Sequence, residues 1–271
     1  MKNLFTFLFA VIFLVSCSME EPASETPDPL ENQFFTEFMP CKAGPDFNSE
    51  NMTAMISDWQ KLITAEDLRG VWGYAPAADT NSVGDTGWWE LEWNSKEAAD
   101  AAWEQWIQND KAIAWQEEYE SVLTCNGEAR NSFDSVLPIT PTTYGETNDS
   151  GYFYSEVYIC ELDVGYSKDD AIQFLYSFRD AVASADYSDT TYHLLNYFFH
   201  EDPSQFLWIN FANSKKSMDK ANSSFEESVR EKMFPLFSEF ATCDEQPDLY
   251  NGFTLYWSEK KDFMPTFPSN S

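Results

Sequence analysis

The sequence predicts an α+β fold in which a βαββαβ unit occurs twice in tandem. Residues 34–41 read FFTEFMPC and residues 153–160 read FYSEVYIC, so a Phe, a Glu and a Cys recur at the same three places. The same shift of 119 residues brings the Asn-Ser-Lys stretch at 94–96 onto the one at 213–215. Apolar positions, cap residues and cysteines therefore keep one order in both copies, which indicates a duplicated unit.

The first copy is expected to run strand, helix, strand, strand, helix, strand. These elements are a strand ending at Cys41, a helix at 51–65, strands at 70–77 and 88–93, a helix from residue 94, and a strand at 131–137. Asn94 or Ser95 can cap the exposed N–H groups at the start of the second helix. Asn94, followed by Glu97 three residues later, is close to a capping box.

The second copy repeats this layout. Its elements are a strand ending at Cys160, a helix at 168–184, strands at 190–199 and 205–211, a helix from residue 213, and a strand at 252–257. Apolar residues within 168–184 roughly follow the helical period of 3.6 residues.

The βαββαβ order builds a ferredoxin-like sandwich, with four antiparallel strands and two helices on one face. The other face stays bare, so two such sheets are expected to pack face to face. Over residues 33–258 the chain thus resembles the dimeric α/β-barrel superfamily, in which two ferredoxin-like units form one barrel. The resemblance implies domains at 33–145 and 146–271, packed as an intramolecular pseudo-dimer in a monomeric chain. It rests on element order and not on a catalytic signature.

The N-terminus indicates export. Lys2 is the only charge before an apolar run over 4–15, which suits the core of a signal peptide. Residues 14–17, LVSC, resemble the lipobox of bacterial lipoproteins. This resemblance implies that residues 1–16 are removed and that Cys17 carries acyl chains. An ordinary secretory signal or a membrane anchor is the alternative.

Residues 17–32 comprise the lipidated Cys17 and a flexible tether, because the segment is rich in Pro, Glu and Ser and lacks aromatic residues. The protein is then expected in the cell envelope, where it contacts the membrane through its lipid anchor only. Ser18 after the lipidated cysteine favours the outer membrane, facing the periplasm or the exterior.

Acidic residues far outnumber basic ones, 46 against 16, which gives a net charge of −30. Such a charge repels nucleic acid, so no nucleic-acid partner is expected. The acids are spread along the chain and not blocked together. This distribution favours a surface adapted to salty water, although a surface that binds cations or a basic partner stays open.

The cysteines are expected to form two disulfides. In a unit of this fold the C-terminal ends of the first strand and the second helix meet at one edge. Cys41 with Cys125, and Cys160 with Cys243, occupy these two places in the two copies. Disulfides persist outside the cytoplasm. Free buried thiols are the alternative. Metal ligation is less expected, because these cysteines lack the Cys-x-x-Cys spacing of zinc sites.

Five residues are candidates for a ligand cavity. Glu37 and Glu156 lie within the first strands and could line the interior as an acid, a base or a ligand anchor, or else meet a structural partner. His193, on an aromatic strand, could bind haem or a metal or move protons, or else be structural. Trp89 and Trp208 are equivalent and could line a cavity for a flat ligand or simply pack in the core.

Neither a cofactor nor a metal site is predicted. Residues 79–90 match an EF-hand loop in part, but Val83 breaks the pattern and the flanks are predicted to be strands. Phosphate-binding and nucleophile motifs are also missing from the sequence.

Three functions remain open from the sequence. The first is a non-catalytic lipoprotein that binds a small apolar or aromatic ligand or an envelope partner. The second is an enzyme, because relatives in the dimeric α/β-barrel superfamily include cofactor-free monooxygenases and haem-degrading oxygenases. Those enzymes work in cavities between sheet and helices, often with a His, Asn or Trp. The third is a structural subunit.

Overall fold

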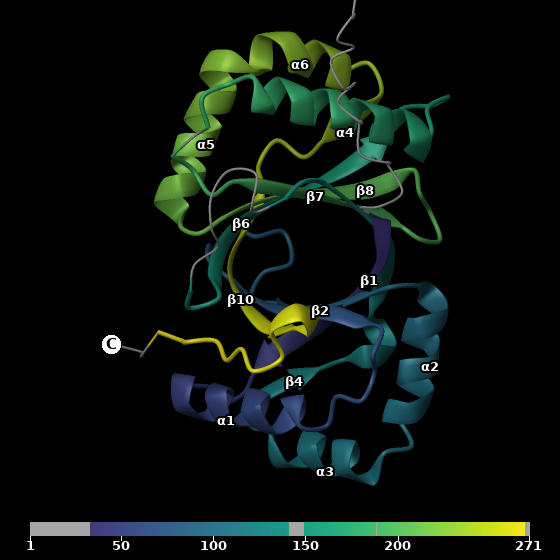
Figure 1. Cartoon of the computed structure of the whole chain (residues 1–271), viewed down its shortest axis with the longest axis vertical. Helices are drawn as coiled ribbons and strands as arrows, with labels where there is room; N and C mark the ends of the chain where they lie inside the picture. The colour runs from purple at the N-terminus through teal and green to yellow at the C-terminus, as the bar shows by residue number, and fades with distance from the viewer. Residues whose placement is uncertain (1–32, 141–148, 188, 269–271) are drawn as a thin grey trace, which may run out of the picture. The chain divides into compact units, whose positions relative to one another are not determined.

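The computed structural model describes residues 33–140, 149–187 and 189–268, and these ranges contain every predicted strand and helix (Figure 1). The predicted signal peptide, Cys17 and the tether lie outside the described residues. No helix within the described ranges is long and apolar enough to cross a membrane.

Each half contains the predicted elements in the predicted order, and each also has one short strand before its last strand that was not predicted. The first half contains β1 (Gln33–Ala43), α1 (Ser49–Gln60), β2 (Leu68–Pro76), β3 (Gly87–Trp93), α2 (Lys96–Trp106), α3 (Asp110–Glu118), β4 (Leu123–Cys125) and β5 (Asn131–Ile139). The second half contains β6 (Tyr152–Leu162), α4 (Lys168–Ala183), β7 (His193–Phe199), β8 (Gln205–Ala212), α5 (Lys215–Ser228), α6 (Arg230–Phe237), β9 (Ala241–Cys243) and β10 (Asp248–Trp257).

The second helix of each copy is broken into two pieces, which was not expected from the sequence. In the first half Asn109 caps the second piece, since its side chain accepts a hydrogen bond from the Lys111 N–H at 3.1 Å.

The first piece of this helix is capped by a serine in both halves. Ser95, and not Asn94, accepts a hydrogen bond from the Ala98 N–H at 3.2 Å. Ser214 does the same for the Ser217 N–H in the second half. Equivalent serines therefore start equivalent helices.

Eight antiparallel strands close into one barrel. The strand order is β10-β2-β3-β1-β5-β7-β8-β6, and β6 pairs with β10 to close the ring. The halves join where β5 pairs with β7 and where β2 pairs with β10. The predicted α+β class is confirmed, but two separate sheets packed face to face are not observed. Edge strands carry unpaired N–H and C=O groups, and closure of the barrel satisfies these groups while it hides both bare faces.

The strands have an inner and an outer face, because successive side chains point to opposite sides. Even-numbered residues of β1 such as Phe34 and Phe38 belong to the barrel interior, whereas Phe35 and Met39 pack toward the helices. Helices α1 to α3 cover the outer face of the first half, and α4 to α6 cover that of the second (Figure 1). Of the three largest buried apolar clusters, one lies inside the barrel and two lie outside it.

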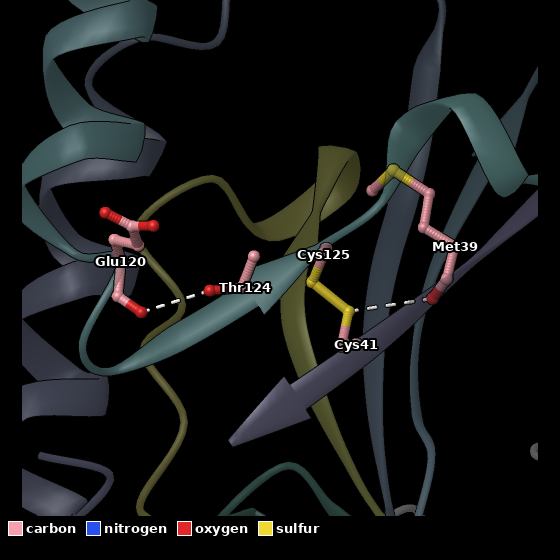
Figure 2. Close-up of a disulfide and its surroundings, with 5 residues drawn as sticks. All are labelled: Met39, Cys41, Glu120, Thr124 and Cys125. Atoms are coloured by element: carbon pink, nitrogen blue, oxygen red, sulfur yellow. Dashed lines mark hydrogen bonds between the residues drawn. A yellow bond between two sulfur atoms is a disulfide. The ribbon is translucent and has the colours of Figure 1, made fainter. Parts of the chain in front are cut away.

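Two disulfides fasten short strands to the first strand of each half. The sulfur atoms of Cys41 and Cys125 are 1.96 Å apart, and those of Cys160 and Cys243 are 1.93 Å apart. These are the two predicted pairs. Cys41 and Cys125 lie directly opposite each other where β1 pairs with β4 (Figure 2), and Cys160 and Cys243 do so where β6 pairs with β9.

Candidate functional site

Each outer layer contains a cavity between the barrel wall and the helices. The first-half cavity measures about 250 Å³ and is walled mainly by Trp and aliphatic side chains. The second-half cavity measures about 670 Å³. Its main aromatic lining residues are Tyr158, Phe174, Phe178, Trp208, Phe225 and Phe237. The two cavities are equivalent in position, so the residues that differ between them indicate what each one can do.

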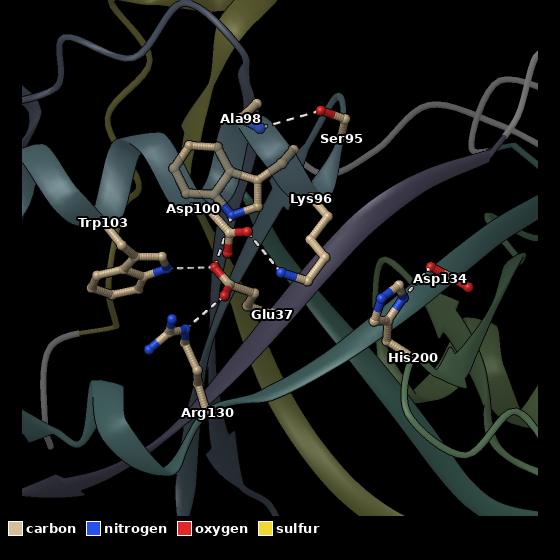
Figure 3. A network of polar contacts seen from close by, with 10 residues as sticks. Glu37, Ser95, Lys96, Ala98, Asp100, Trp103, Arg130, Asp134 and His200 are labelled. Atoms are coloured by element: carbon tan, nitrogen blue, oxygen red, sulfur yellow. Dashed lines mark hydrogen bonds and ion pairs between the residues drawn. The ribbon is translucent and has the colours of Figure 1, made fainter.

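Glu37 is the buried carboxylate on the outer face of the first half, and only 2% of it is exposed. It accepts hydrogen bonds from the indole Nε1 of Trp93 at 3.1 Å and of Trp103 at 2.6 Å (Figure 3). The Arg130 Nε donates a third bond at 2.6 Å and neutralises the charge. The Arg130 guanidinium also lies 4.7 Å from the Trp103 ring centre. The Glu37 carboxylate has hydrogen-bond partners on both oxygens and connects β1 to α2, so its role is structural.

Glu156 takes the same place in the second half but has weaker partners. The amide Nδ2 of Asn222 lies 3.1 Å from both carboxylate oxygens. Asn222 stands where the first half has Trp103, and none of the ion pairs found among the described residues involves Glu156. Burial raises the pKa of Glu156, and the Asn222 amide offsets this only in part. The second half therefore contains a buried carboxylate with a raised affinity for protons.

A polar cluster forms part of the wall of the second-half cavity. The Asn210 Oδ1 accepts a hydrogen bond from the Tyr192 hydroxyl at 3.0 Å and one from the Trp208 Nε1 at 2.9 Å. These bonds fix the orientation of the Asn210 amide. Asn222 lines the same cavity. Aromatic walls with a few convergent polar groups are typical of pockets for small ligands.

The structure does not bring the five predicted cavity residues together in one cavity. Glu37 and Trp89 lie on the outer face of the first half, and Trp89 packs edge-on against Trp59 at 5.1 Å. Glu156 and Trp208 lie on the outer face of the second half. Neither glutamate lines an interior between two sheets, and Glu37 meets structural partners, which was the other alternative.

The alternation of side chains along β1 explains the position of Glu37. Thr36 belongs to the opposite face, where it accepts a hydrogen bond from the Ser135 hydroxyl at 2.8 Å. The two-residue period of the strand then turns Glu37 toward the helices, on the same face as Phe35 and Met39.

Some residues of the second-half cavity were missed in the sequence. Asn210 falls on Leu91 and Asn222 falls on Trp103 when the chain is shifted by 119 residues. A polar residue that replaces an apolar one at an equivalent position was the available signal. Tyr192 had no such signal, because it precedes the strand in which the pattern is regular.

The histidines do not support a haem held by imidazole in either outer cavity. His193 faces the barrel interior and stacks on Phe211, with ring centres 4.7 Å apart. Burial lowers the pKa of His193 to about 4. The Nδ1 of His200 lies 2.9 Å from Asp134 Oδ1 (Figure 3). Neither ring lines an outer cavity, and the described residues contain no group of three or more His, Cys, Asp or Glu that could hold a metal.

Comparison with known proteins gives a likeness of fold. No protein-family model matches the chain, and neither does any curated protein. A candidate monooxygenase from Fusobacterium nucleatum subsp. nucleatum is similar in structure, with a TM-score of 0.52 and 8% identity over 83% of this chain and 93% of that chain. At this identity the likeness concerns the fold alone.

Two further solved structures have lower scores. A candidate monooxygenase from Lactobacillus acidophilus has a TM-score of 0.47 and 12% identity, over 88% of this chain and 98% of that chain. A variant of chlorite dismutase from Candidatus Nitrospira defluvii has a TM-score of 0.48 and 11% identity, over 82% of this chain and 92% of that chain. The likeness to the Fusobacterium protein, together with the closed barrel of eight strands and its outer helices, shows that the two proteins share a fold.

Proposed function

We propose that the protein is a cofactor-free, monooxygenase-like enzyme whose second-half cavity binds a small planar aromatic substrate. The observation that carries this proposal is a cavity of about 670 Å³ with aromatic walls, two asparagine amides and a buried carboxylate behind one of them. The first half serves as an internal comparison. There the equivalent carboxylate is neutralised by Arg130 and the cavity is only about 250 Å³.

Binding would use the aromatic walls and the two amides. Phe174 and Phe178 of α4 and Trp208 of β8 offer ring faces and edges to a flat ligand. Asn222 turns its amide nitrogen toward Glu156, so its oxygen points elsewhere and can accept a hydrogen bond from a substrate hydroxyl. Such a set selects a molecule with a flat apolar body and a polar edge.

The chemistry would begin with removal of a proton from the bound substrate. We assign Glu156 as the final acceptor, because burial raises its pKa and it lies directly behind Asn222, which lines the cavity. The proton would reach Glu156 through a water molecule, because the Asn222 amide only donates hydrogen bonds to the carboxylate. An activated CH₂ group between aromatic rings loses a proton to give a carbanion. The carbanion reduces O₂ and bonds to it as a peroxide anion, which takes the proton back from Glu156 and becomes a hydroperoxide at that carbon. Loss of water then leaves a ketone, so one oxygen atom enters the product and the other leaves as water.

A second candidate function is ligand binding without turnover. The aromatic walls favour it, because they provide binding whether or not Glu156 moves a proton. The similar structure from Fusobacterium nucleatum is described as a candidate monooxygenase, which agrees with the enzymatic proposal but concerns the fold.

We further propose that the protein is an envelope lipoprotein anchored through Cys17. The lipobox-like LVSC stretch supports this proposal, and so do the two disulfides, which suit an oxidising compartment.

We also propose that the halves descend from one ferredoxin-like unit. Equivalent helix caps in the two halves support this origin. Equivalent ion pairs from Lys96 to Asp100 and from Lys215 to Asp219 support it as well.

The enzymatic proposal is tested with anthrone as the probe, without added cofactor. We expect quenching of tryptophan fluorescence on binding, uptake of O₂, and formation of anthraquinone. Glu156→Gln should lower O₂ uptake at least tenfold with little change in binding, and Asn222→Leu should weaken binding. Glu161→Gln, exposed on the same strand, is the matched control and should change neither. Binding of anthrone without uptake of O₂ would contradict the enzymatic proposal and favour ligand binding without turnover. Absence of both binding and O₂ uptake would contradict the assignment of this cavity as the site.

A further inference from the structure

A separate group of buried acids lies inside the barrel, on the face opposite to Glu37 and Glu156. On β3 the residues Glu90 and Glu92 point inward, whereas the Trp and Leu residues that alternate with them belong to the outer layer. Glu90 is 1% exposed and Glu92 is 9% exposed. Because they are two residues apart on one strand, the two carboxylates point to the same side of the sheet and lie close together.

Strands from both halves hold Glu90 in place. It accepts hydrogen bonds from the Tyr74 hydroxyl of β2 and from the Tyr197 hydroxyl of β7, the latter at 2.8 Å. Tyr74 comes from the first half and Tyr197 from the second, so the site exists only when the barrel is closed. Among the described residues, the one ion pair to either carboxylate joins Arg69 Nε to Glu92 Oε2 at 3.9 Å.

These groups line a cavity of about 840 Å³ in the barrel. Its aromatic walls include Trp72, Tyr74, Phe153, His193, Tyr197 and Phe211. The Nδ1 of His193 is buried and has no hydrogen-bond partner among the described residues. The wall of the cavity therefore includes carboxylates without a full counter-charge and a histidine with one unsatisfied ring nitrogen.

The charges that face the cavity are mostly negative. The acids that line it are Glu90, Glu92, Asp149 and Glu259, against the bases Arg69 and Lys260. Burial raises the pKa of Glu90 to about 7, and burial together with the charge of Glu90 raises the pKa of Glu92 well above its usual range. A buried carboxylate without a full counter-charge is costly, and a cation that enters would remove this cost.

We propose that the barrel interior binds a small organic ammonium ion, with Glu90 and Glu92 as its counter-ions and the aromatic rings as its walls. Ring faces attract an ammonium group, and this attraction is larger where water is excluded. An organic cation fits better than a metal ion, because the described residues offer no group of three or more metal-ligating side chains here. The negative charge of the chain adds a long-range attraction for cations. This site is independent of the second-half cavity.

Benzylamine, benzyl alcohol and benzoate test the proposal, because they share one ring and differ in charge. We expect calorimetry at pH 8 to show benzylamine binding at least tenfold more tightly than benzyl alcohol, with no binding of benzoate. Equal binding of the amine and the alcohol, or preference for benzoate, would overturn the proposal.

Two variants assign the binding to the carboxylate. Glu90→Gln should weaken benzylamine binding at least tenfold, while Glu97→Gln, exposed on α2, should have no effect. Glutamine keeps the size of the side chain and an acceptor for one of the two tyrosine hydroxyls, and its NH₂ group can donate to the oxygen of the other. Near-ultraviolet circular dichroism checks that the variant is folded. Unchanged benzylamine binding by a folded Glu90→Gln variant would overturn the proposal.

Proton release gives a second readout. At pH 7 benzylamine should displace a proton from Glu90, because the cation favours the ionised form. Tyr74 and Tyr197 stay neutral at this pH since burial raises their pKa, and His193 stays neutral since burial lowers its pKa to about 4. Calorimetry in two buffers of different ionisation enthalpy should detect this release in the wild type, and a smaller release from Glu92 alone in Glu90→Gln. Equal proton release by the wild type and by Glu90→Gln would contradict the assignment of Glu90.

Discussion

Glu37 and Glu156 show how one strand position acquires two different roles. Both are buried, on equivalent first strands, and both face the helices. Glu37 meets two indoles and a guanidinium, whereas Glu156 meets the amide of Asn222. The partners of the carboxylate, and not the glutamate itself, decide whether it is neutralised.

At the residue scale we therefore predict unequal effects of the same substitution. Glu37→Gln should lower the free energy of unfolding by about 3 kcal/mol, because it leaves the Arg130 charge partly buried and unpaired. Glu156→Gln should change it by less than about 1 kcal/mol, because no cation loses its partner. Urea denaturation at pH 7 measures both, and equal losses would contradict the structural role assigned to Glu37.

Glu90 should impose a dependence of stability on pH. Its pKa is about 7 in the folded protein against 4.5 for an unperturbed glutamate, so the folded state binds more protons between these values. Stability contributed by protonated Glu90 is then lost as the pH rises from about 5 to 7, by up to roughly 3 kcal/mol. The difference in unfolding free energy between wild type and Glu90→Gln should follow this change, and a flat difference would contradict it.

At the element scale the disulfides connect the short strands β4 and β9 to the first strands β1 and β6. They close loops with sequence separations of 84 and 83 residues, so their effects on the unfolded chain should be nearly equal. This equality follows from the nearly equal loop lengths and not from any detail of the surrounding side chains.

Removal of either disulfide should destabilise the protein by about 2–4 kcal/mol. The variants are Cys41→Ser with Cys125→Ser, and Cys160→Ser with Cys243→Ser. Thermal unfolding compares them, and a thiol reagent should label these four cysteines only after reduction. Labelling of the folded, unreduced protein at these positions would contradict the pairing.

The whole molecule depends on contacts between its halves inside the barrel. Phe38 of the first half lies 5.2 Å from Tyr197 of the second, and Tyr74 lies 5.3 Å from Phe153, measured between ring centres. The strand pairs β5–β7 and β2–β10 add backbone hydrogen bonds across the same boundary. Neither half can bury its inner face alone.

We predict that fragments 33–145 and 146–271 do not fold as stable monomers when they are produced separately. Mixed together, they should form a one-to-one complex with the circular dichroism of the whole chain, because closure satisfies the open strand edges. Light scattering after size exclusion measures the stoichiometry. A stable monomer of either fragment would contradict the dependence on closure.

Much of the fold followed from local patterns and from the repeat. Helix and strand positions, the paired serine caps and the cysteine pairs are encoded by residues near one another or repeated at nearly one offset. The candidate site could be predicted less completely from the sequence. Asn210 and Asn222 matter through what they contact, and those contacts join residues of different strands and helices.

By itself the sequence determined the order of the main helices and strands in each half and the pairing of the cysteines at equivalent edges. Only the tertiary structure decided that the two sheets join at their edges into one barrel, and that Glu90 faces inward while Glu37 faces the helices. The physical reason is that a strand period of two residues defines two faces without saying which one becomes the interior. That choice depends on pairing between strands far apart in the chain.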